Sequence, residues 1–433
     1  MSPAPESLQQ LPEDEPRTGL AVRLRRLALD LRPLRASRAY RNLLIGDAVS
    51  VIGTQITVVA VPLQVYRDTH SAAAVGLVGL AGLIPLIALG LYGGAVADAV
   101  DRRRLVLATT CSQALLSALL FAQAVAGLQS TLLLYAIVAA QAGLFALDSP
   151  ARSAFIPRLL SPELLPAANA LRQVEFNIAV TMGPLLAGLL IAGPGYAAAY
   201  GLDAISFAAT IYAVASLPSM APEGGGRKAG LASVVEGLRF LVTRKVLMMT
   251  FVVDIIAMVF GMPRALFGPL ADGVFHGGPS AAGAMYSALG AGALLGAVFG
   301  GWLGRVHRQG LAVVVSIVAW GAAIVGFGLA SQLWLALVFL AAAGAADMVS
   351  AVFRTAIMQT AAPDEMRGRL GGVFIVVVAG GPRLGDARAG GGASLVGLQG
   401  SVIAGGLTVI ALTVAAALLA PRFAKYDVRD PQH

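Results

Sequence analysis

The sequence predicts an all-α integral membrane protein with twelve transmembrane helices in two six-helix bundles. Its 433 residues are 57% hydrophobic and only 12% charged, with a mean hydropathy of +0.78. This is more apolar surface than a water-soluble core can bury. Apolar segments of membrane-spanning length recur along the chain, and one long polar segment in its interior divides them six and six.

Each predicted span is long enough to cross a hydrocarbon core of about 30 Å at about 1.5 Å per residue. The eleventh span is the least regular, because Arg383, Asp386 and Arg388 interrupt it. The predicted spans are 42–66, 72–98, 104–127, 130–150, 170–193, 197–218, 246–272, 280–304, 310–330, 333–353, 368–394 and 400–420.

The spans divide the chain into five parts. These are an N-terminal tail (1–41), a first bundle (42–218), a linker (219–245), a second bundle (246–420) and a C-terminal tail (421–433). Leucines 20, 24, 27 and 31 are spaced as on a helix among arginines, so the tail is either an amphipathic helix on an anionic membrane surface or a disordered, topology-fixing segment. The linker has apolar residues from 231 to 241 at helical spacing, which predicts a short amphipathic helix.

The basic residues predict the orientation. Of the 31 Lys and Arg residues, 26 fall in the two tails, the linker and the loops on the same side of the membrane. The positive-inside rule therefore places both termini in the cytoplasm, as an even number of spans requires.

Composition excludes several classes of protein. The net charge of +8 lies in short arginine clusters with few aromatic residues nearby, which argues against nucleic-acid binding. The single cysteine, Cys111, is expected to be a small buried residue, and four scattered histidines predict no metal site. No P-loop motif is present, so a gradient or a partner must supply energy. The sequence offers no clustered nucleophile or cofactor site and no folded extramembrane domain, so we expect neither an enzyme nor a scaffold.

A knot of charge lies between the second and third spans. The apolar run ends near Gly94, and Asp98, Asp101, Arg102 and Arg103 follow at once. Asp101 is placed to cap the exposed amides at the start of the third span. The arginines oppose that helix dipole, so they are explained by topology or by ion pairing with Asp98 or Asp101 at a closing interface.

Two internal repeats support the division into halves. The segment from Arg152 to Glu163 follows the fourth span, and the segment from Arg354 to Glu365 follows the tenth, at an offset of 202. A glycine pair at 300–301 echoes the charge knot, with arginines at the places of its two acids. Two parallel six-span repeats are a known transporter plan.

The charge knot resembles the signature Gly-x-x-x-Asp-Arg-x-Gly-Arg-Arg of the major facilitator superfamily. Gly94, Asp98, Arg102 and Arg103 match it, while Ala99 replaces its first arginine and Asp101 its internal glycine. The resemblance implies a gating role for Asp98.

Dispersed short motifs resemble those of the enterobactin-type siderophore exporters and the actinobacterial multidrug-efflux transporters of the same superfamily. The resemblance implies a bacterial inner-membrane exporter of a small organic molecule, working without a cofactor as a monomer and coupled to proton entry. A siderophore-type cargo is the sharper hypothesis, broad drug efflux is the alternative, and spacing alone does not exclude an importer. The motifs are Ala60-Val-Pro-Leu-Gln-Val, Thr69-His-Ser, Leu165-Pro-Ala-Ala-Asn, Gly237-Leu-Arg-Phe, Met358-Gln-Thr-Ala-Ala-Pro and Gly385-Asp-Ala.

The fifth span contains Gly183, Pro184 and Gly188, which resemble the antiporter motif of the superfamily. Proline removes an amide and glycine allows close approach, so the helix either seals a leak path or simply packs. Three glycines four apart in the eighth span (292, 296 and 300) are assigned to helix packing.

Ionisable residues inside spans are costly and are candidates for proton coupling or for the substrate cavity. Asp254 is the strongest candidate for a proton carrier, because it lies well inside the seventh span. Arg172 with Glu175, and Arg383 with Asp386, are each three residues apart and are spaced to pair, either as structural salt bridges or as substrate ligands exposed in one conformation. Asp47 and Asp347 lie near the cytoplasmic ends of their spans and are expected to be solvated or to pair between the bundles. Asp148 is expected in the turn between the fourth and fifth spans, and Asp203 near the outer surface.

Overall fold

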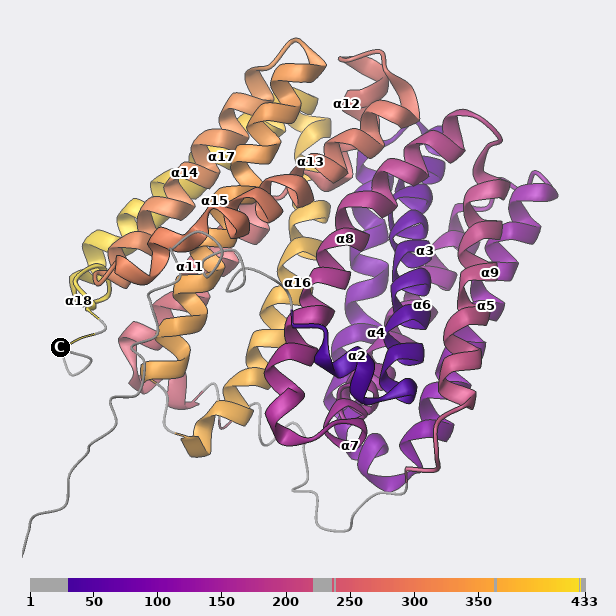
Figure 1. Cartoon of the computed structure of the whole chain (residues 1–433). Helices are drawn as coiled ribbons and strands as arrows, with labels where there is room; N and C mark the ends of the chain where they lie inside the picture. The colour runs from indigo at the N-terminus through magenta and orange to yellow at the C-terminus, as the bar shows by residue number, and fades with distance from the viewer. Residues whose placement is uncertain (1–29, 221–235, 237–238, 362–363, 428, 430–433) are drawn as a thin grey trace, which may run out of the picture.

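The computed structural model describes residues 30–220, 236, 239–361, 364–427 and 429. Its elements in these ranges are helices, and they follow the predicted spans closely (Figure 1). The expected amphipathic helices of the N-terminal tail and the linker lie largely outside the described residues. The first six long helices are α3 (Arg38–Thr69), α4 (Ala72–Ala99), α5 (Arg102–Val125), α6 (Thr131–Ser153), α8 (Leu165–Ala192) and α9 (Tyr196–Ala215).

The second half repeats this plan with two interruptions. Its elements are α11 (Lys245–Gly261), η2 (Arg264–Leu266), α12 (Phe267–Gly273), α13 (Gly278–Val298), η3 (Gly300–Arg305), α14 (Gln309–Leu329), α15 (Leu333–Ala361), α16 (Asp364–Val396) and α17 (Leu398–Leu419).

Short helices flank the long ones in both halves. They are α2 (Arg32–Ala36), α7 (Ile156–Leu159) and η1 (Pro162–Leu164) in the first half and α18 (Pro421–Ala424) after the second.

The seventh predicted span, 246–272, is confirmed as a segment able to cross the membrane, but it is not one continuous helix. The helix α11 stops at Gly261, and the chain passes through Met262 and Pro263 before η2 and α12 complete the crossing. Proline cannot donate the backbone hydrogen bond that a continuing helix needs. The eighth span is likewise divided, because α13 ends at Val298 and η3 follows.

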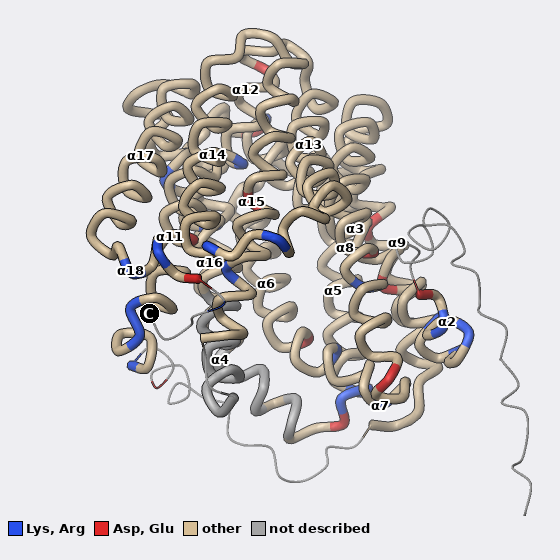
Figure 2. The backbone as a smooth tube through the Cα atoms, turned by 60° about the vertical axis from the view of Figure 1, so that its left-hand side comes forward, with Lys and Arg blue, Asp and Glu red and all other residues tan. Residues whose placement is uncertain are grey.

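Eleven helical segments of the described part are long and apolar enough to cross a membrane. The remaining predicted span, the eleventh, is α16, a helix of 33 residues that carries the expected interruptions Arg383, Asp386 and Arg388. It forms one helix despite them and despite Pro382. Lys and Arg gather mainly toward the end of the molecule that holds α2, α7 and α18 (Figure 2).

The helices pack into two groups that follow the sequence halves. In the first, α3 packs against α8 and α9, α4 against α6, and α5 against α6 and α9. In the second, α14 packs against α15 and α17, α13 against α15, and α11 against α16 and α17. Two large contacts join the groups: α4 lies along α16, and α8 lies along α13. Smaller contacts join α4 to η2, and α3 to α12 and α13.

Glycines make both joining contacts close. A Cβ atom at Gly79 would lie 2.7 Å from the carbonyl oxygen of Arg383, and one at Gly283 would lie 2.9 Å from the Cα of Gly188. These approaches involve the first half of α4 and of α13 and the second half of α8 and of α16. All four segments lie toward the end of the molecule opposite the linker, so the two halves are closed against each other at that end.

Helix α5 shows why burial is hard to predict in a membrane. Cys111 is exposed, which contradicts the expectation that it is buried. Leu115 and Leu119, one and two turns further, are exposed as well. A peripheral helix in a bilayer turns an apolar face outward, so an apolar neighbourhood in sequence does not imply a position in the protein core.

Candidate functional site

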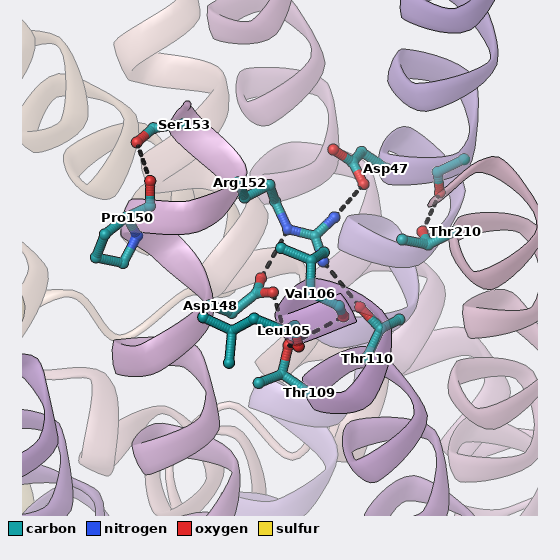
Figure 3. A network of polar contacts seen from close by, with 11 residues as sticks. Asp47, Leu105, Val106, Thr109, Thr110, Asp148, Pro150, Arg152, Ser153 and Thr210 are labelled. Carbon is teal, nitrogen blue, oxygen red and sulfur yellow. Dashed lines mark hydrogen bonds and ion pairs between the residues drawn. The ribbon is translucent and has the colours of Figure 1, made fainter. Parts of the chain in front are cut away.

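Arg152 is the centre of a polar cluster in the first half of the protein (Figure 3). Its Nη1 group donates to Asp47 of α3, and its Nε group donates to Asp148 Oδ2 at 2.7 Å. Its Nη2 group donates to the Thr110 hydroxyl at 3.0 Å, and Thr109 donates to the other oxygen of Asp148 at 2.8 Å. The cluster therefore binds α3, α5 and α6 together.

Helix geometry explains why α6 supplies two members of this cluster. Asp148 and Arg152 are four residues apart, so their side chains share one face of α6. The Arg152 side chain is 18% exposed to solvent, while the Asp148 side chain is buried. A buried carboxylate is stable only when paired, and one guanidinium here serves two of them. Asp148 was expected in the turn after the fourth span, and the structure instead buries it inside α6.

Two further predicted residues lie beside this cluster. Arg172 of α8 lines a small cavity of about 10 Å³ with Tyr40, Asp47 and Arg152, with room for one water molecule at most. Asp47, Arg172 and Arg152 are all close enough to act electrostatically on Glu175. The predicted Arg172 and Glu175 therefore share one site with Asp47.

Arg354 forms the corresponding cluster in the second half. Its Nη1 group pairs with Asp254 of α11, and its Nη2 group lies 3.7 Å from Asp347 Oδ1. The Arg354 and Asp254 side chains are 9% and 5% exposed, so this ion pair is buried. Asp254, the strongest predicted proton carrier, is thus buried as expected and has a cation as its partner.

Asp47 and Asp347 were expected to be solvated or to pair between the bundles. The structure pairs Asp47 with Arg152 of its own half. Asp347 lies 3.7 Å from Arg354 of its own half and keeps 39% of its side chain exposed, so it is partly solvated as expected. The physical reason is that each arginine lies on the helix next to, or on the same helix as, its aspartate, whereas the halves approach closely at the opposite end.

Asp386 and Arg383 of α16 have separate roles. Asp386 Oδ1 accepts a hydrogen bond from the backbone amide of Ala265 at 3.0 Å, which holds η2 after the break in the seventh span. Arg383 donates to the carbonyl of Ala379 at 2.6 Å, and its Nε atom lies against Gly82 of α4. The expected pairing of Arg383 with Asp386 is replaced by these contacts, and Arg383 reaches across to the first half.

The charge knot is anchored to α9. Asp101 is the N-cap of α5, as predicted, and accepts from the amide of Arg104 at 3.0 Å. Its other oxygen accepts from the Ser219 hydroxyl and from the amide of Met220 at 3.1 Å. These hydrogen bonds, that of Ser219 first, lower the pKa of Asp101 below its ordinary value.

Arg103 extends the same junction. Its guanidinium donates to the carbonyls of Val214 and Ala215 at the C-terminal end of α9, where a positive charge favours the helix dipole. Asp101 and Arg103 therefore join the 2–3 turn to the start of the linker within one half. Gly94 and Asp98 belong to the last turns of α4, and the Asp98 side chain lies outside the described part. Arg102 has contacts of its own.

The antiporter-like residues lie where α8 meets two neighbours. A Cβ at Gly183 would lie 2.5 Å from the Cβ of Gln55 on α3. On the other side, the carbonyl of Pro184 and the backbone of Gly188 lie against Gly283 of α13. Pro184 and Gly188 therefore form part of the contact between the halves, whereas Gly183 packs against α3 within the first half. Gly292 and Gly296 lie against α15, in agreement with the packing role assigned to them.

Sequence reasoning did not select Arg152 and Arg354 as site residues, although both open the repeated segments. The signal that points to them is an aspartate one or two turns earlier on the same helix, at Asp148 and Asp347. Within the described residues, no group of three or more His, Cys, Asp or Glu side chains is placed to hold a metal ion.

Comparison with known proteins identifies the family and the fold. A family model described as transmembrane secretion effector, of the major facilitator superfamily, matches residues 29–432. The chain belongs to this family of the major facilitator superfamily. It is therefore a transporter and a multi-pass protein of the bacterial inner membrane.

Curated relatives include the enterobactin exporter EntS of Shigella boydii, 29% identical over 408 residues, which covers 93% of this chain and 97% of that protein. The enterobactin exporter EntS of Citrobacter koseri is 30% identical over 390 residues, with 89% and 92% covered. Among solved structures, the nucleoside transporter NupG has a TM-score of 0.71 at 14% identity, covering 90% of this chain and all of that chain. A POT family transporter has a TM-score of 0.72 at 12% identity, covering 89% and 97%. These structures show the same fold.

Proposed function

We propose that this protein is a proton-coupled exporter that moves a siderophore-type small organic molecule out of the cell by alternating access. The observation that carries the choice of cargo is the similarity to enterobactin exporters over nearly the full length of both chains. In this proposal the protein works as a monomer in the lipid bilayer, with the linker and both termini in the cytoplasm. A broad-specificity multidrug pump of the same superfamily is the alternative.

The closed end of the molecule supports an inward-facing state. The close approaches of α4 to α16 and of α8 to α13 lie opposite the linker. If the linker is cytoplasmic, as the distribution of basic residues predicts, the exit side is sealed and the carrier is ready to receive cargo from inside. Pro184 and Gly188 then form part of the outer seal, which is the role that the antiporter resemblance implies, and Gly183 packs the same helix against α3.

The first-half cluster supports coupling to protons. Arg152 and Arg172 supply two positive charges, while Asp47, Asp148 and Glu175 can supply three negative charges. With all five ionised, the group carries one excess negative charge, which a single bound proton neutralises. Because an unbalanced charge in a low-dielectric setting is costly, proton binding here changes the relative energy of conformations that hydrate the cluster differently.

The second-half cluster adds a second proton acceptor. Asp254 is paired with Arg354, which also has Asp347 within 3.7 Å. In our proposal, Asp254 binds a proton when Arg354 turns to Asp347 or to an anionic group of the cargo. Asp254 releases this proton when its ion pair with Arg354 forms again. Arg383, which already reaches α4, is a further cation available to an anionic cargo.

The cargo is tested with inside-out vesicles from cells that make the protein. A catecholate siderophore and a lipophilic cationic drug are offered separately, under an imposed pH gradient and with its collapse by an ionophore as the control. Gradient-dependent accumulation of the siderophore supports the proposed cargo. Accumulation of the cationic drug alone supports the multidrug alternative instead.

A further inference from the structure

We propose that Asp203 is a proton-binding site of the first half, and that it holds a proton in the conformation described here. Asp203 lies in α9, where its side chain meets α3 and α5, apart from the arginine clusters. It was expected near the outer surface. The structure instead places it about 10 Å along α9 by helical rise and leaves it 1% exposed.

The two carboxyl oxygens of Asp203 have different surroundings. Oδ2 accepts from the Thr57 hydroxyl of α3 at 2.6 Å and from the Ser117 hydroxyl of α5 at 2.7 Å. Oδ1 is buried without a hydrogen-bond partner among the described residues. This is the arrangement of a carboxylic acid, in which a well-bonded carbonyl oxygen and a hydroxyl group take different environments.

Charge balance separates Asp203 from the other buried aspartates. Asp47, Asp148 and Asp254 each contact a guanidinium. The ion pairs and hydrogen bonds of the described part bring only neutral groups to Asp203. An ionised carboxylate that is buried without a cation is far less stable than its neutral form.

The groups that face Asp203 are neutral on every packed helix. Helix α3 contributes Thr57 and Gly53, and α5 contributes Ser117. Gln141 of α6 donates to Ser117 at 3.4 Å. The nearest titratable neighbour on α9 itself is Tyr200, one turn away, whose hydroxyl is already bonded to Gln64 at 2.8 Å.

Close packing favours a proton over a metal cation at this place. A Cβ atom at Gly53 would lie 2.9 Å from Asp203 Oδ1 and would overlap the Ser206 hydroxyl. The hydroxyls of Thr57 and Ser117 already point at the carboxyl group as donors. A sodium ion would need these oxygens to turn around it and would need space of its own, whereas a proton needs neither.

Loss of this proton has a structural consequence. The charged form of Asp203 requires water or a cation, and either must enter between α3 and its neighbours α5 and α9. Because α3 also carries Asp47 of the Arg152 cluster and contacts Gly183, such loosening acts on the helix that links cluster and outer seal. Asp203 is therefore a place where pH can bias the conformation of the carrier.

The test is infrared difference spectroscopy on purified protein during a pH titration, which detects the carbonyl stretch of a protonated carboxyl group. We expect a band at neutral pH that Asp203→Asn removes and that Asp47→Asn, a control at an arginine-paired acid, leaves in place. Thr57→Val removes one donor to the carbonyl oxygen, so the same band should shift to higher frequency in a protein that keeps Asp203.

An unchanged spectrum at neutral pH in both Asp203→Asn and Thr57→Val would overturn the proposal. Loss of the band on replacing potassium with sodium would show a sodium site and would overturn it as well. The measurement does not depend on transport, so the site stands or fails separately from the proposed antiport.

Discussion

Arg152 and Arg354 occupy equivalent places in the two halves. Each lies on the fourth long helix of its half, and its side chain pairs with an aspartate on the first long helix of that half, Asp47 or Asp254. Each also has a second aspartate on its own helix, Asp148 or Asp347. The pairs therefore hold each half together internally, which allows the halves to rock as units while protonation adjusts the charge inside each.

Breaking the buried pair of the second half should destabilise the protein. Arg354→Gln leaves Asp254 as a buried charge without a partner, which typically costs about 3–5 kcal/mol. We expect a lower unfolding temperature in detergent micelles, measured by intrinsic fluorescence. Arg308→Gln is the matched control, because Arg308 is exposed in the turn before α14.

The double variant Arg354→Gln with Asp254→Asn should regain part of this loss, since it removes the stranded charge as well. If the single and double variants unfold at the same temperature, the ion pair does not contribute in the way described.

Adding a methyl group at the crossing of α8 and α13 should hinder closure of the exit side. A Cβ at Gly283 would lie 2.5 Å from the carbonyl of Pro184. Backbone atoms cannot give way cheaply, so Gly283→Ala should push the halves apart at this end and reduce transport several-fold. Gly391→Ala, a change in α16 with open space around it, is the control.

The readout for this variant is the labelling of a single cysteine placed on the exit side by a membrane-impermeant reagent, in a background without Cys111. Faster labelling in Gly283→Ala than in Gly391→Ala is expected. Equal labelling rates and equal transport would show that the crossing does not form the seal.

The cap of α5 predicts a stability effect that depends on pH. Asp101→Ala removes the acceptor for Arg104, Ser219 and Met220, and N-cap losses amount to about 0.5–2 kcal/mol. The pKa of Asp101 is lowered in the folded protein. Its contribution is therefore fully present at neutral pH and is lost as the pH falls below about 4, through the lowered pKa.

Thermal unfolding of Asp101→Ala and of the native chain at neutral pH and in acid checks this prediction. The difference between them should narrow as the pH falls. A difference that persists unchanged in acid would mean that ionised Asp101 is not the stabilising species.

Neutralising Asp98 should alter conformational balance more than folding. Asp98 ends the second span, at the position that the superfamily signature assigns to gating. Asp98→Asn is expected to keep the native unfolding temperature while changing the rate of transport. Transport kinetics indistinguishable from those of the native chain would remove Asp98 from the gate.

The fold could be predicted from the sequence because the spans, the linker and the repeats each have a recognisable pattern of hydrophobic and charged residues. It also located Asp101 correctly, since a cap is a local feature of one helix terminus. The break at Pro263 was visible in the sequence, but a proline inside an apolar run is compatible with either a kink or a stop.

The partners of buried charges could not be predicted in the same way. Asp47 and Arg152 are more than a hundred residues apart, and their contact depends on how α3 packs beside α6. Asp203 looked like an outer-surface residue because its depth in the bundle depends on the neighbours of α9. Such contacts belong to tertiary packing, which brings together residues that are distant in the sequence.

Proton-driven efflux in proteoliposomes tests the central claim most directly. Vesicles with the linker side outward and an acidic lumen are given a catecholate siderophore, and both siderophore uptake and lumenal pH are followed. Our account predicts siderophore entry together with faster loss of lumenal protons, both reduced by Asp254→Asn. A protonophore, which dissipates the pH gradient itself, should abolish siderophore entry. Siderophore entry at the same rate with and without the gradient, or in Asp254→Asn at the native rate, would contradict it.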